Sequence, residues 1–265
     1  FDRETGCVRW FYEASAEVRT GIVVSPWAAG DKSATPMIFF GDLIGNQYAL
    51  DAMTGEMVWK QRPDEAPTAT LTGTPTLHEG ILYVPVSSLE VVPAAESGYE
   101  CCHFRGSVVA YEAKTGTQKW KAFTIPDVPV KQGKNSVGTQ NYGPSGAPIW
   151  NSPSIDIARN QLLVGTGENY SSPASGESDA IIAFDLETGA TNWVFQATAG
   201  DAWNTACGQD EDANCPVEDG PDYDFGAGVI VAKDVDGRDY IIGGQKSGVV
   251  YAVSPESGEL VWKTK

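Results

Sequence analysis

The sequence predicts an all-β protein assembled from repeated four-stranded units. Five segments of the 265-residue chain share one pattern, in which an apolar or aromatic residue and a short polar stretch lead to Thr-Gly or Ser-Gly and then to Trp. The 29 glycines and 16 prolines indicate many turns. The apolar runs stay shorter than the roughly 18 residues that a membrane span needs. These observations favour short strands and tight turns over a membrane-spanning segment.

The repeated segment has the pattern of a β-hairpin. Its five copies are "FDRETGCVRW", "LDAMTGEMVW", "YEAKTGTQKW", "FDLETGATNW" and "VSPESGELVW". Glycine is expected to adopt positive φ in each turn, at Gly6, Gly55, Gly116, Gly189 and Gly258. A tryptophan follows four residues later in every copy, at Trp10, Trp59, Trp120, Trp193 and Trp262. We expect these indoles to pack between neighbouring units, where they bury a large apolar area.

Each hairpin is preceded by a further pair of predicted strands. The pairs cover residues 18–24 and 37–42, 72–77 and 81–88, 150–155 and 161–167, and 224–231 and 240–245. Each unit therefore has four strands, as in the blades of a β-propeller. The sequence predicts four complete blades preceded by the end of a fifth, so residues 1–265 form part of a single propeller domain. An unrelated set of hairpins in a sandwich is the alternative.

The charge and the cysteines limit the class of protein and its environment. A net charge of -17 makes nucleic acid an unsuitable partner, because phosphate binding needs clustered Lys and Arg. The spacing of the five cysteines fits no zinc pattern. Cys207 and Cys215 bracket a polar insertion that a disulfide could close, which favours a periplasmic or secreted location. The chain begins without Met or a signal peptide and within a repeat, so we interpret it as part of a longer protein.

Polar residues collect where a propeller brings its loops near the axis. The predicted inner strands begin with Arg19, Thr72, Trp150 and Asp224. The loops after the second strands offer Asp42, Ser87, Glu90, Glu168, Asn169 and Lys246. Burying so many charged groups costs several kcal/mol unless a ligand or an ion satisfies them. This pattern favours a bound cofactor over a purely structural propeller.

The hairpin resembles the repeat of the PQQ-dependent quinoprotein alcohol dehydrogenases, and the resemblance covers essentially the whole chain. That family consists of eight-bladed propellers that hold pyrroloquinoline quinone (PQQ) and Ca²⁺, so the resemblance implies both cofactors and about half of the blades here. Non-catalytic propellers share the same repeat. The alternative function is therefore a propeller scaffold that binds protein partners.

The resemblance also implies roles for individual residues around the quinone and the metal. The stretch "TLTGTPTLHEGILYVPVSSLE" looks like the segment that supplies a cofactor-contacting Thr and Ser and a calcium-binding Glu, here Thr72, Ser87 and Glu90. The stretch "IWNSPSIDIARNQLLVGTGENY" is similar to the segment whose Trp lies under the quinone, here Trp150. A calcium-binding Asn follows in the family. Glu168 occupies the in-register place and Asn169 comes next, and Asn169 is the preferred ligand.

The catalytic base and the cation beside the quinone are implied by two further segments. The stretch "DYDFGAGVIV" resembles the segment that carries the base, which implies Asp224, with Asp222 as the second choice. The stretch "GGQKSGVVYAVSPESGELVW" resembles the segment with an Arg or Lys beside the quinone oxygens, which implies Lys246. Arg19 is a further candidate partner for a cofactor carboxylate.

Within the family, the cysteine-bracketed insertion and "CCHFRGSVVAYEAKTG" look most like polyvinyl alcohol dehydrogenases. The resemblance implies oxidation of secondary alcohols, with polyvinyl alcohol as a candidate substrate, and electrons passed to cytochrome c. The chain carries no haem-attachment motif, so that cytochrome lies outside it. For the adjacent Cys101 and Cys102, we expect one of them to bond to Cys7 and so to fasten the loop after Glu90.

Overall fold

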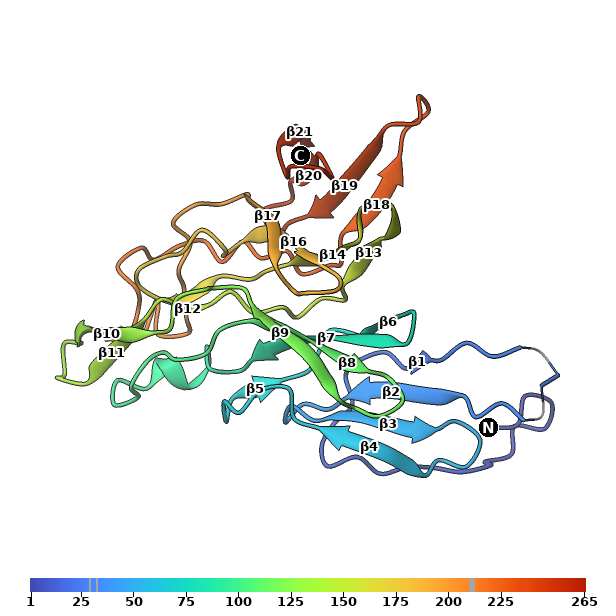
Figure 1. Cartoon of the computed structure of the whole chain (residues 1–265). Helices are drawn as coiled ribbons and strands as arrows, with labels where there is room; N and C mark the ends of the chain where they lie inside the picture. The colour runs from blue at the N-terminus through green and yellow to red at the C-terminus, as the bar shows by residue number, and fades with distance from the viewer. Residues whose placement is uncertain (29, 32, 210–212) are drawn as a thin grey trace.

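The computed structural model describes residues 1–28, 30–31, 33–209 and 213–265. Within these residues, consecutive strands form four antiparallel sheets that follow one another in chain order, from blue to red in Figure 1. We call them blades 1 to 4. The predicted all-β architecture of four-stranded blades is confirmed.

The strands of the blades have the following bounds. Blade 1 consists of β1 (Val23–Val24), β2 (Met37–Gly41), β3 (Gln47–Asp51) and β4 (Met57–Gln61). Blade 2 consists of β6 (Thr76–His78), β7 (Ile81–Ser88), β8 (Ser107–Glu112) and β9 (Gln118–Phe123). Blade 3 consists of β13 (Ser154–Asp156), β14 (Gln161–Gly165), β16 (Ala180–Asp185) and β17 (Thr191–Gln196). Blade 4 consists of β18 (Ile230–Lys233), β19 (Asp239–Gly244), β20 (Val250–Val253) and β21 (Leu260–Thr264).

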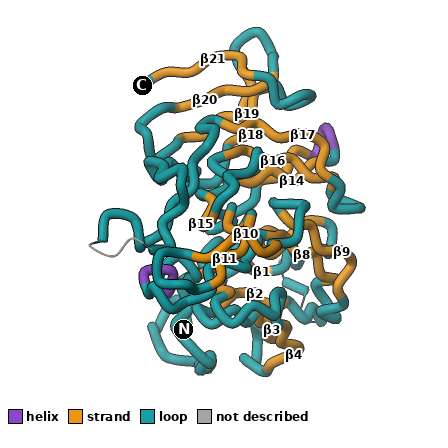
Figure 2. The backbone as a smooth tube through the Cα atoms, turned by 90° about the vertical axis from the view of Figure 1, so that its left-hand side faces the viewer, coloured by secondary structure: helices purple, strands orange, loops and turns teal. Residues whose placement is uncertain are grey.

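Short elements lie outside the blades. They are β5 (Ala69–Thr70), which pairs with β7, the hairpin of β10 (Val130–Lys134) and β11 (Gln140–Gly143), the pair of β12 (Ser145–Gly146) and β15 (Asn169–Ser171), and two 3₁₀ turns, Pro93–Ala95 and Ile157–Arg159. Figure 2 shows the loops and turns, in teal, that connect the strands, in orange. The described part of the chain contains no helix with the length and apolar character of a membrane span.

The repeated hairpin turns have the predicted geometry. All five glycines have positive φ, between 70° and 77°. In the copy at residues 50–59, the Asp51 carboxylate accepts the N–H groups of Met53 (2.7 Å) and Thr54 (3.0 Å), which closes the turn before Gly55. The acidic residue and the glycine of the motif therefore act together: one satisfies turn N–H groups, and the other adopts the left-handed backbone.

The repeated tryptophans connect each blade to the next one. Their indole N–H groups donate to a carbonyl in the following unit: Trp10 to Ala52, Trp59 to Ala113, Trp120 to Leu186 and Trp193 to Pro255, at 2.8–3.1 Å. The glycine of that following turn lies on the indole, where a Cβ would come within 2.6–2.8 Å of ring atoms. The spacing of Gly and Trp in the sequence thus encodes contacts between blades.

The hydrophobic core lies between the blades. Successive strand residues point to opposite faces, so a strand covered on both sides is apolar throughout. In β8, Val109 and Tyr111 pack into the cluster shared with blade 1, while Val108 and Ala110 pack into the cluster shared with blade 3. A third cluster joins blades 3 and 4. This layered packing fixes the relative positions of the loops at the ends of the blades.

The first repeat forms no strand. Residues 1–17 hold the turn at Gly6 and then run as extended chain without sheet partners among the described residues. Trp10 and Tyr12 still pack on Phe40, Tyr48 and Leu50 of blade 1. The predicted end of a fifth blade is therefore present through its tryptophan contact and absent as a strand.

The disulfides match one prediction and correct another. Cys207 is bonded to Cys215, as predicted. The pairing expected for Cys7 is wrong, because Cys101 is bonded to Cys102 and Cys7 is an exposed free thiol. Cys101 and Cys102 are fully buried beneath the Tyr170 carbonyl, whereas Cys7 lies in an exposed turn.

Candidate functional site

Four of the predicted residues converge at the ends of blades 3 and 4. Trp150 lies four residues before β13, and Asp224 lies six residues before β18. Glu168 lies three residues after β14, and Lys246 lies two residues after β19. The inner strands therefore start later than the sequence suggested, since Trp150 and Asp224 precede them. Both residues belong to connecting segments that lie outside the strands.

Asp224 is the centre of this arrangement. Its Oδ2 accepts a hydrogen bond from the Trp150 indole N–H (3.0 Å) and pairs with the Lys246 ammonium (3.0 Å). Its Oδ1 accepts the backbone N–H of Glu168 (2.9 Å). The carboxyl group is almost fully buried. Three donors on a buried carboxylate fix its orientation, as a catalytic base requires.

Glycines permit this close approach. A Cβ at Gly167 would lie 3.0 Å from Asp224 Oδ1, and one at Gly226 would lie 2.4 Å from the Trp150 ring. The Gly-Thr-Gly and Phe-Gly-Ala-Gly stretches of the sequence are therefore needed where backbone meets side chain. Trp150 packs its ring edge on Gly226 and keeps part of its surface exposed.

Lys246 joins two carboxylates. Its Nζ lies 2.8 Å from Asp222 Oδ1 and 5.7 Å from the centre of the Trp150 ring. Although burial alone lowers the pKa of Lys246, the hydrogen bonds and charges of Asp222 and Asp224 outweigh it and raise the pKa. Lys246 therefore stays an ammonium ion at neutral pH, and it supplies the fixed positive charge of the site.

Glu168, Asp222 and Asp224 form an acidic cluster. One carboxylate oxygen from each lies within 4.8 Å of the others. Burial, and then the charge of Asp224, raise the pKa of Glu168 well above its ordinary value. Burial likewise raises the pKa of Asp222, to about 6, although Lys246 opposes this shift. The three carboxyl groups offer more oxygen donors than one ammonium ion can pair with, and this suits a divalent cation such as Ca²⁺.

Glu90 and Asn169 lie outside the acidic cluster. The buried carboxylate of Glu90 accepts the N–H groups of His103 and Phe104 and the Tyr99 hydroxyl at 2.7–3.1 Å. It thus fixes the loop around Cys101 and Cys102. The Asn169 amide donates to Ser145 O (2.9 Å), and its oxygen accepts the N–H of Ser175 (2.7 Å). Of the two residues predicted as alternatives, the structure brings Glu168 and not Asn169 to Asp224.

The remaining predicted cofactor residues come from blades 1 and 2. Arg19 is exposed, and its guanidinium lies 3.5 Å from the carboxylate of Glu17. Thr72 is half-buried in the segment before β6, and Ser87 is buried in β7 opposite Thr70. In the described part of the chain, no hydrogen bond or ion pair joins these three side chains to the acidic cluster. Their predicted roles therefore stay predictions.

Sequence reasoning missed two buried carboxyl groups beside the cluster, those of Asp179 and Asp201. Asp201 Oδ1 accepts the N–H of Asp222 and Oδ2 that of Tyr223, so it contacts the segment that carries Asp224. The only sequence signal is an acidic residue that directly precedes the apolar run "AIIAF" of β16.

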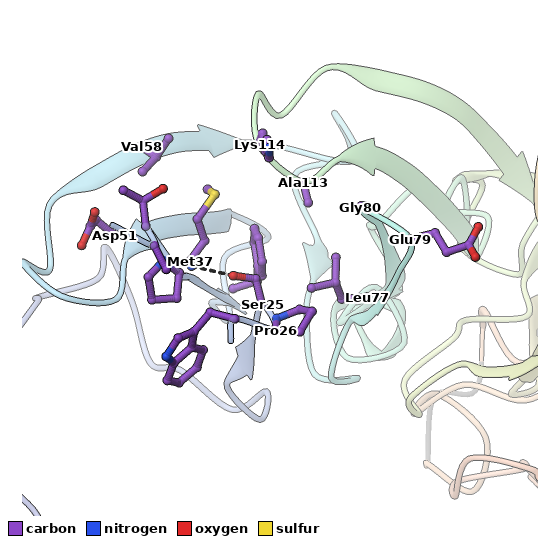
Figure 3. Close-up of a pocket in the computed structure, with 15 residues that line it drawn as sticks. Ser25, Pro26, Met37, Asp51, Val58, Leu77, Glu79, Gly80, Ala113 and Lys114 are labelled. Carbon is purple, nitrogen blue, oxygen red and sulfur yellow. Dashed lines mark hydrogen bonds between the residues drawn. The ribbon is translucent and has the colours of Figure 1, made fainter. Parts of the chain in front are cut away.

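A pocket of about 620 Å³ lies elsewhere, between blades 1 and 2 (Figure 3). Its lining includes Ser25, Met37 and Asp51 of blade 1 and Leu77 and Lys114 of blade 2. These residues adjoin the ends of β1 and β3 and the start of β2, at the opposite ends of the strands from Arg19 and Asp42. None of the predicted site residues lines this pocket.

A family model and the sequences of curated proteins both assign the chain to the same family. The model of the PQQ family, described as the β-propeller domain of glucose, ethanol and alcohol dehydrogenases, matches residues 1–265. A polyvinylalcohol dehydrogenase from Pseudomonas sp. is 41% identical over 260 residues, which cover 98% of this chain and 40% of that protein. One from Sphingopyxis sp. (strain 113P3) is 39% identical over 263 residues, with the same coverage. The chain thus spans about 40% of the length of these relatives.

The solved structures that the chain resembles have the same architecture. The quinohemoprotein alcohol dehydrogenase of Comamonas testosteroni superposes with a TM-score of 0.62 at 24% identity, over 86% of this chain and 34% of that one. A europium-containing methanol dehydrogenase gives a TM-score of 0.63 at 22% identity, over 92% and 41% of the two chains. These likenesses show the fold.

Proposed function

This chain belongs to the PQQ family of glucose, ethanol and alcohol dehydrogenase β-propellers, and from this premise we propose that the whole protein oxidises secondary alcohols, including polyvinyl alcohol. The fixed carboxylate of Asp224, held by Trp150, Lys246 and the Glu168 backbone, carries the proposal. The polymer substrate is supported by the two polyvinylalcohol dehydrogenases at 41% and 39% identity.

The residues of the site suit the cofactors that the family uses. The partly exposed indole of Trp150 and the ammonium of Lys246 would hold PQQ, since PQQ is a planar anion that matches an aromatic face and a positive charge. Glu168 and Asp224 would hold Ca²⁺, because their two carboxylates, when ionised, carry more negative charge than the single ammonium of Lys246 neutralises. When bound, PQQ would supply the acceptor for the hydride of the alcohol carbon, and Ca²⁺ would supply Lewis acidity.

The side chains of this chain handle the proton. Asp224 accepts the hydroxyl proton as the carbon–hydrogen bond breaks, which leaves a carbonyl product. Trp150 and the Glu168 N–H keep the carboxylate in one orientation during this transfer. Lys246 carries the positive charge that stabilises negative charge developing beside it. Two electrons leave to a cytochrome c, and the two disulfides support a periplasmic or secreted location.

The test uses the full-length protein reconstituted with PQQ and Ca²⁺. We expect a quinone absorbance that survives gel filtration, and reduction of an artificial dye with secondary alcohols and with polyvinyl alcohol. Preparations that lack PQQ or contain a chelator serve as controls. If the protein neither retains the quinone nor reduces the dye, the catalytic proposal fails and the non-catalytic scaffold is the better interpretation.

The choice of metal ligands has its own test. Glu168→Gln, Asn169→Ala and Glu90→Gln are compared by Ca²⁺ titration of the chelator-treated protein. Loss of a direct ligand should raise the Ca²⁺ concentration needed for half-maximal activity by at least about tenfold. We expect this for Glu168→Gln. If this concentration rises only in Asn169→Ala or Glu90→Gln, the Ca²⁺ site would be assigned to the residues that the family resemblance favours.

A further inference from the structure

Asp179 is a buried acid that the proposed mechanism does not use. Its side chain has no exposed surface, and neither carboxyl oxygen meets a hydrogen-bond donor among the described residues. Its backbone is held on both sides, because its N–H donates to Gly167 O (3.0 Å) and its carbonyl accepts the N–H of Ala197 (3.0 Å). An ionised carboxylate in such a place is costly. The position therefore calls for a protonated carboxyl group that donates a hydrogen bond.

The neighbouring acceptor is the carboxylate of Asp201. Ser178, which directly precedes Asp179, donates its hydroxyl to the Asp201 carbonyl (3.3 Å), and the Asp201 carboxylate acts on the pKa of the Asp179 carboxyl group. Asp201 has no exposed surface either. Its Oδ1 accepts the N–H of Asp222 (3.2 Å), and its Oδ2 accepts the N–H of Tyr223 (3.0 Å). A Cβ at Gly220 would lie only 2.2 Å from Asp201 Oδ1. Asp201 thus binds the backbone just before Asp224 and packs closely against Gly220 of the same segment.

Two neighbouring carboxyl groups that are both fully buried are expected to share one proton, because two negative charges without solvent repel each other strongly. Both oxygens of Asp201 already act as acceptors, each for one backbone N–H group. Asp179 has no donor and faces the carboxylates of Asp201, Asp222 and Asp224. Burial first, and then these charges, raise the pKa of Asp179 to about 9. The proton therefore resides on Asp179 at neutral pH.

We propose that Asp179 is a positioning residue: its carboxyl group donates to the Asp201 carboxylate, which holds the backbone of residues 222–223 and so aims Asp224 at its partners. This inference rests on the proposed function in one respect, that Asp224 is the base. The connection runs from Asp179 through Asp201 to the backbone two residues before Asp224.

Two variants of the full-length enzyme test the proposal. Asp179→Asn keeps a donor for Asp201, and Asn tolerates the left-handed backbone at this position, where φ is 49°. Asp179→Gly also accepts that backbone and removes the donor. We expect Asp179→Gly to lower kcat by about tenfold or more, with KM changed less than about twofold, since small displacements of a reacting group cost up to about 10²-fold. Asp179→Asn should restore kcat to within about threefold of the unaltered enzyme. Equal loss in both variants, or no loss in Asp179→Gly, would overturn the proposal.

A second measurement is independent of turnover and of bound cofactor. With a pKa of about 9 in the folded state and an ordinary value of 3.8 when unfolded, Asp179 makes the native protein hold an extra proton between these pH values. Its contribution to stability is complete below pH 3.8 and falls as the pH rises to about 9. Asp179→Asn lacks this dependence, so the difference in melting temperature between Asp179→Asn and the unaltered protein should shift in favour of the variant from pH 6 to 9. A constant difference would overturn the shared proton, whereas an inactive but pH-responsive protein would instead count against the proposed function.

Discussion

The contacts between blades and the contacts at the acidic cluster are built in different ways. Between blades, the same pair recurs four times: an indole donates to a carbonyl of the next unit and lies on the glycine of its turn. At the acidic cluster, Trp150, Glu168, Asp224 and Lys246 each occur once, at the end of a different strand or connection. Repeated residues therefore build the scaffold, and residues that break the repeat form the candidate site.

Asp224→Asn is the sharpest test of this contrast. The amide keeps the size of the side chain and cannot take up a proton, so kcat should fall by about 10²- to 10⁴-fold. Bound quinone and melting temperature should change little. Asp236→Asn, in the exposed turn before β19, is the matched control and should leave kcat intact. Retained turnover in Asp224→Asn would assign the base to Asp222.

Trp59→Ala tests the scaffold side. Trp59 is 7% exposed, and its indole donates to Ala113 O at 2.8 Å, so its removal leaves a cavity between blades 1 and 2. We expect a loss of about 3–5 kcal/mol in the free energy of unfolding, measured by denaturant titration. Trp27→Ala, at a tryptophan that is 54% exposed, should cost far less. Similar losses in both variants would contradict the role of the repeated indole.

Gly116→Ala separates backbone strain from packing. Gly116 has a φ of 70°, and its added Cβ would lie 2.8 Å from the Trp59 ring. Gly237→Ala is the control, because Gly237 has a φ of 83° and open space around it. Both variants bear the cost of a left-handed residue, about 1–2 kcal/mol. Only Gly116→Ala should add about 1–3 kcal/mol for overpacking. Equal destabilisation of the two variants would show that the Trp59 indole moves aside for the added Cβ.

Arg159→Met should have the smallest effect. Arg159 joins blades 3 and 4 through Asp156, Asp239 and Glu256, at 2.6–3.0 Å. This contact is also unrepeated, yet it lies partly in solvent and away from the acidic cluster. We expect a loss of about 1 kcal/mol or less, which shrinks in 1 M NaCl, and unchanged kcat. Lys119→Met, at an exposed lysine of β9, is the control. A fall in kcat would extend the site to this network.

The sequence by itself determined the repeat and what depends on it. Because the spacing of Gly and Trp reflects local turn geometry, it predicted the hairpins, the four blades and the burial of Trp59 and Trp193. Trp10 and Trp120 are partly buried. Trp262 differs from this prediction, since it is 40% exposed. The resemblance also selected Trp150, Asp224 and Lys246, which the structure brings together. These residues are recognisable because short motifs surround them.

Only the tertiary structure decided what depends on contacts between distant segments. The choice between Glu168 and Asn169 as the neighbour of Asp224 depends on which of two adjacent side chains lies near a segment 56 residues away, and it is the carboxylate of Glu168 that lies within 4.8 Å of that of Asp224. The bond between Cys101 and Cys102, in place of one to Cys7, follows from burial that no spacing reveals. Asp179 and Asp201 are 22 positions apart in the chain, and packing brings their segments together, since the Ser178 hydroxyl donates to Asp201 O at 3.3 Å. A local pattern specifies a turn or a strand, whereas the partners of a buried charge are set by the segments that fold around it.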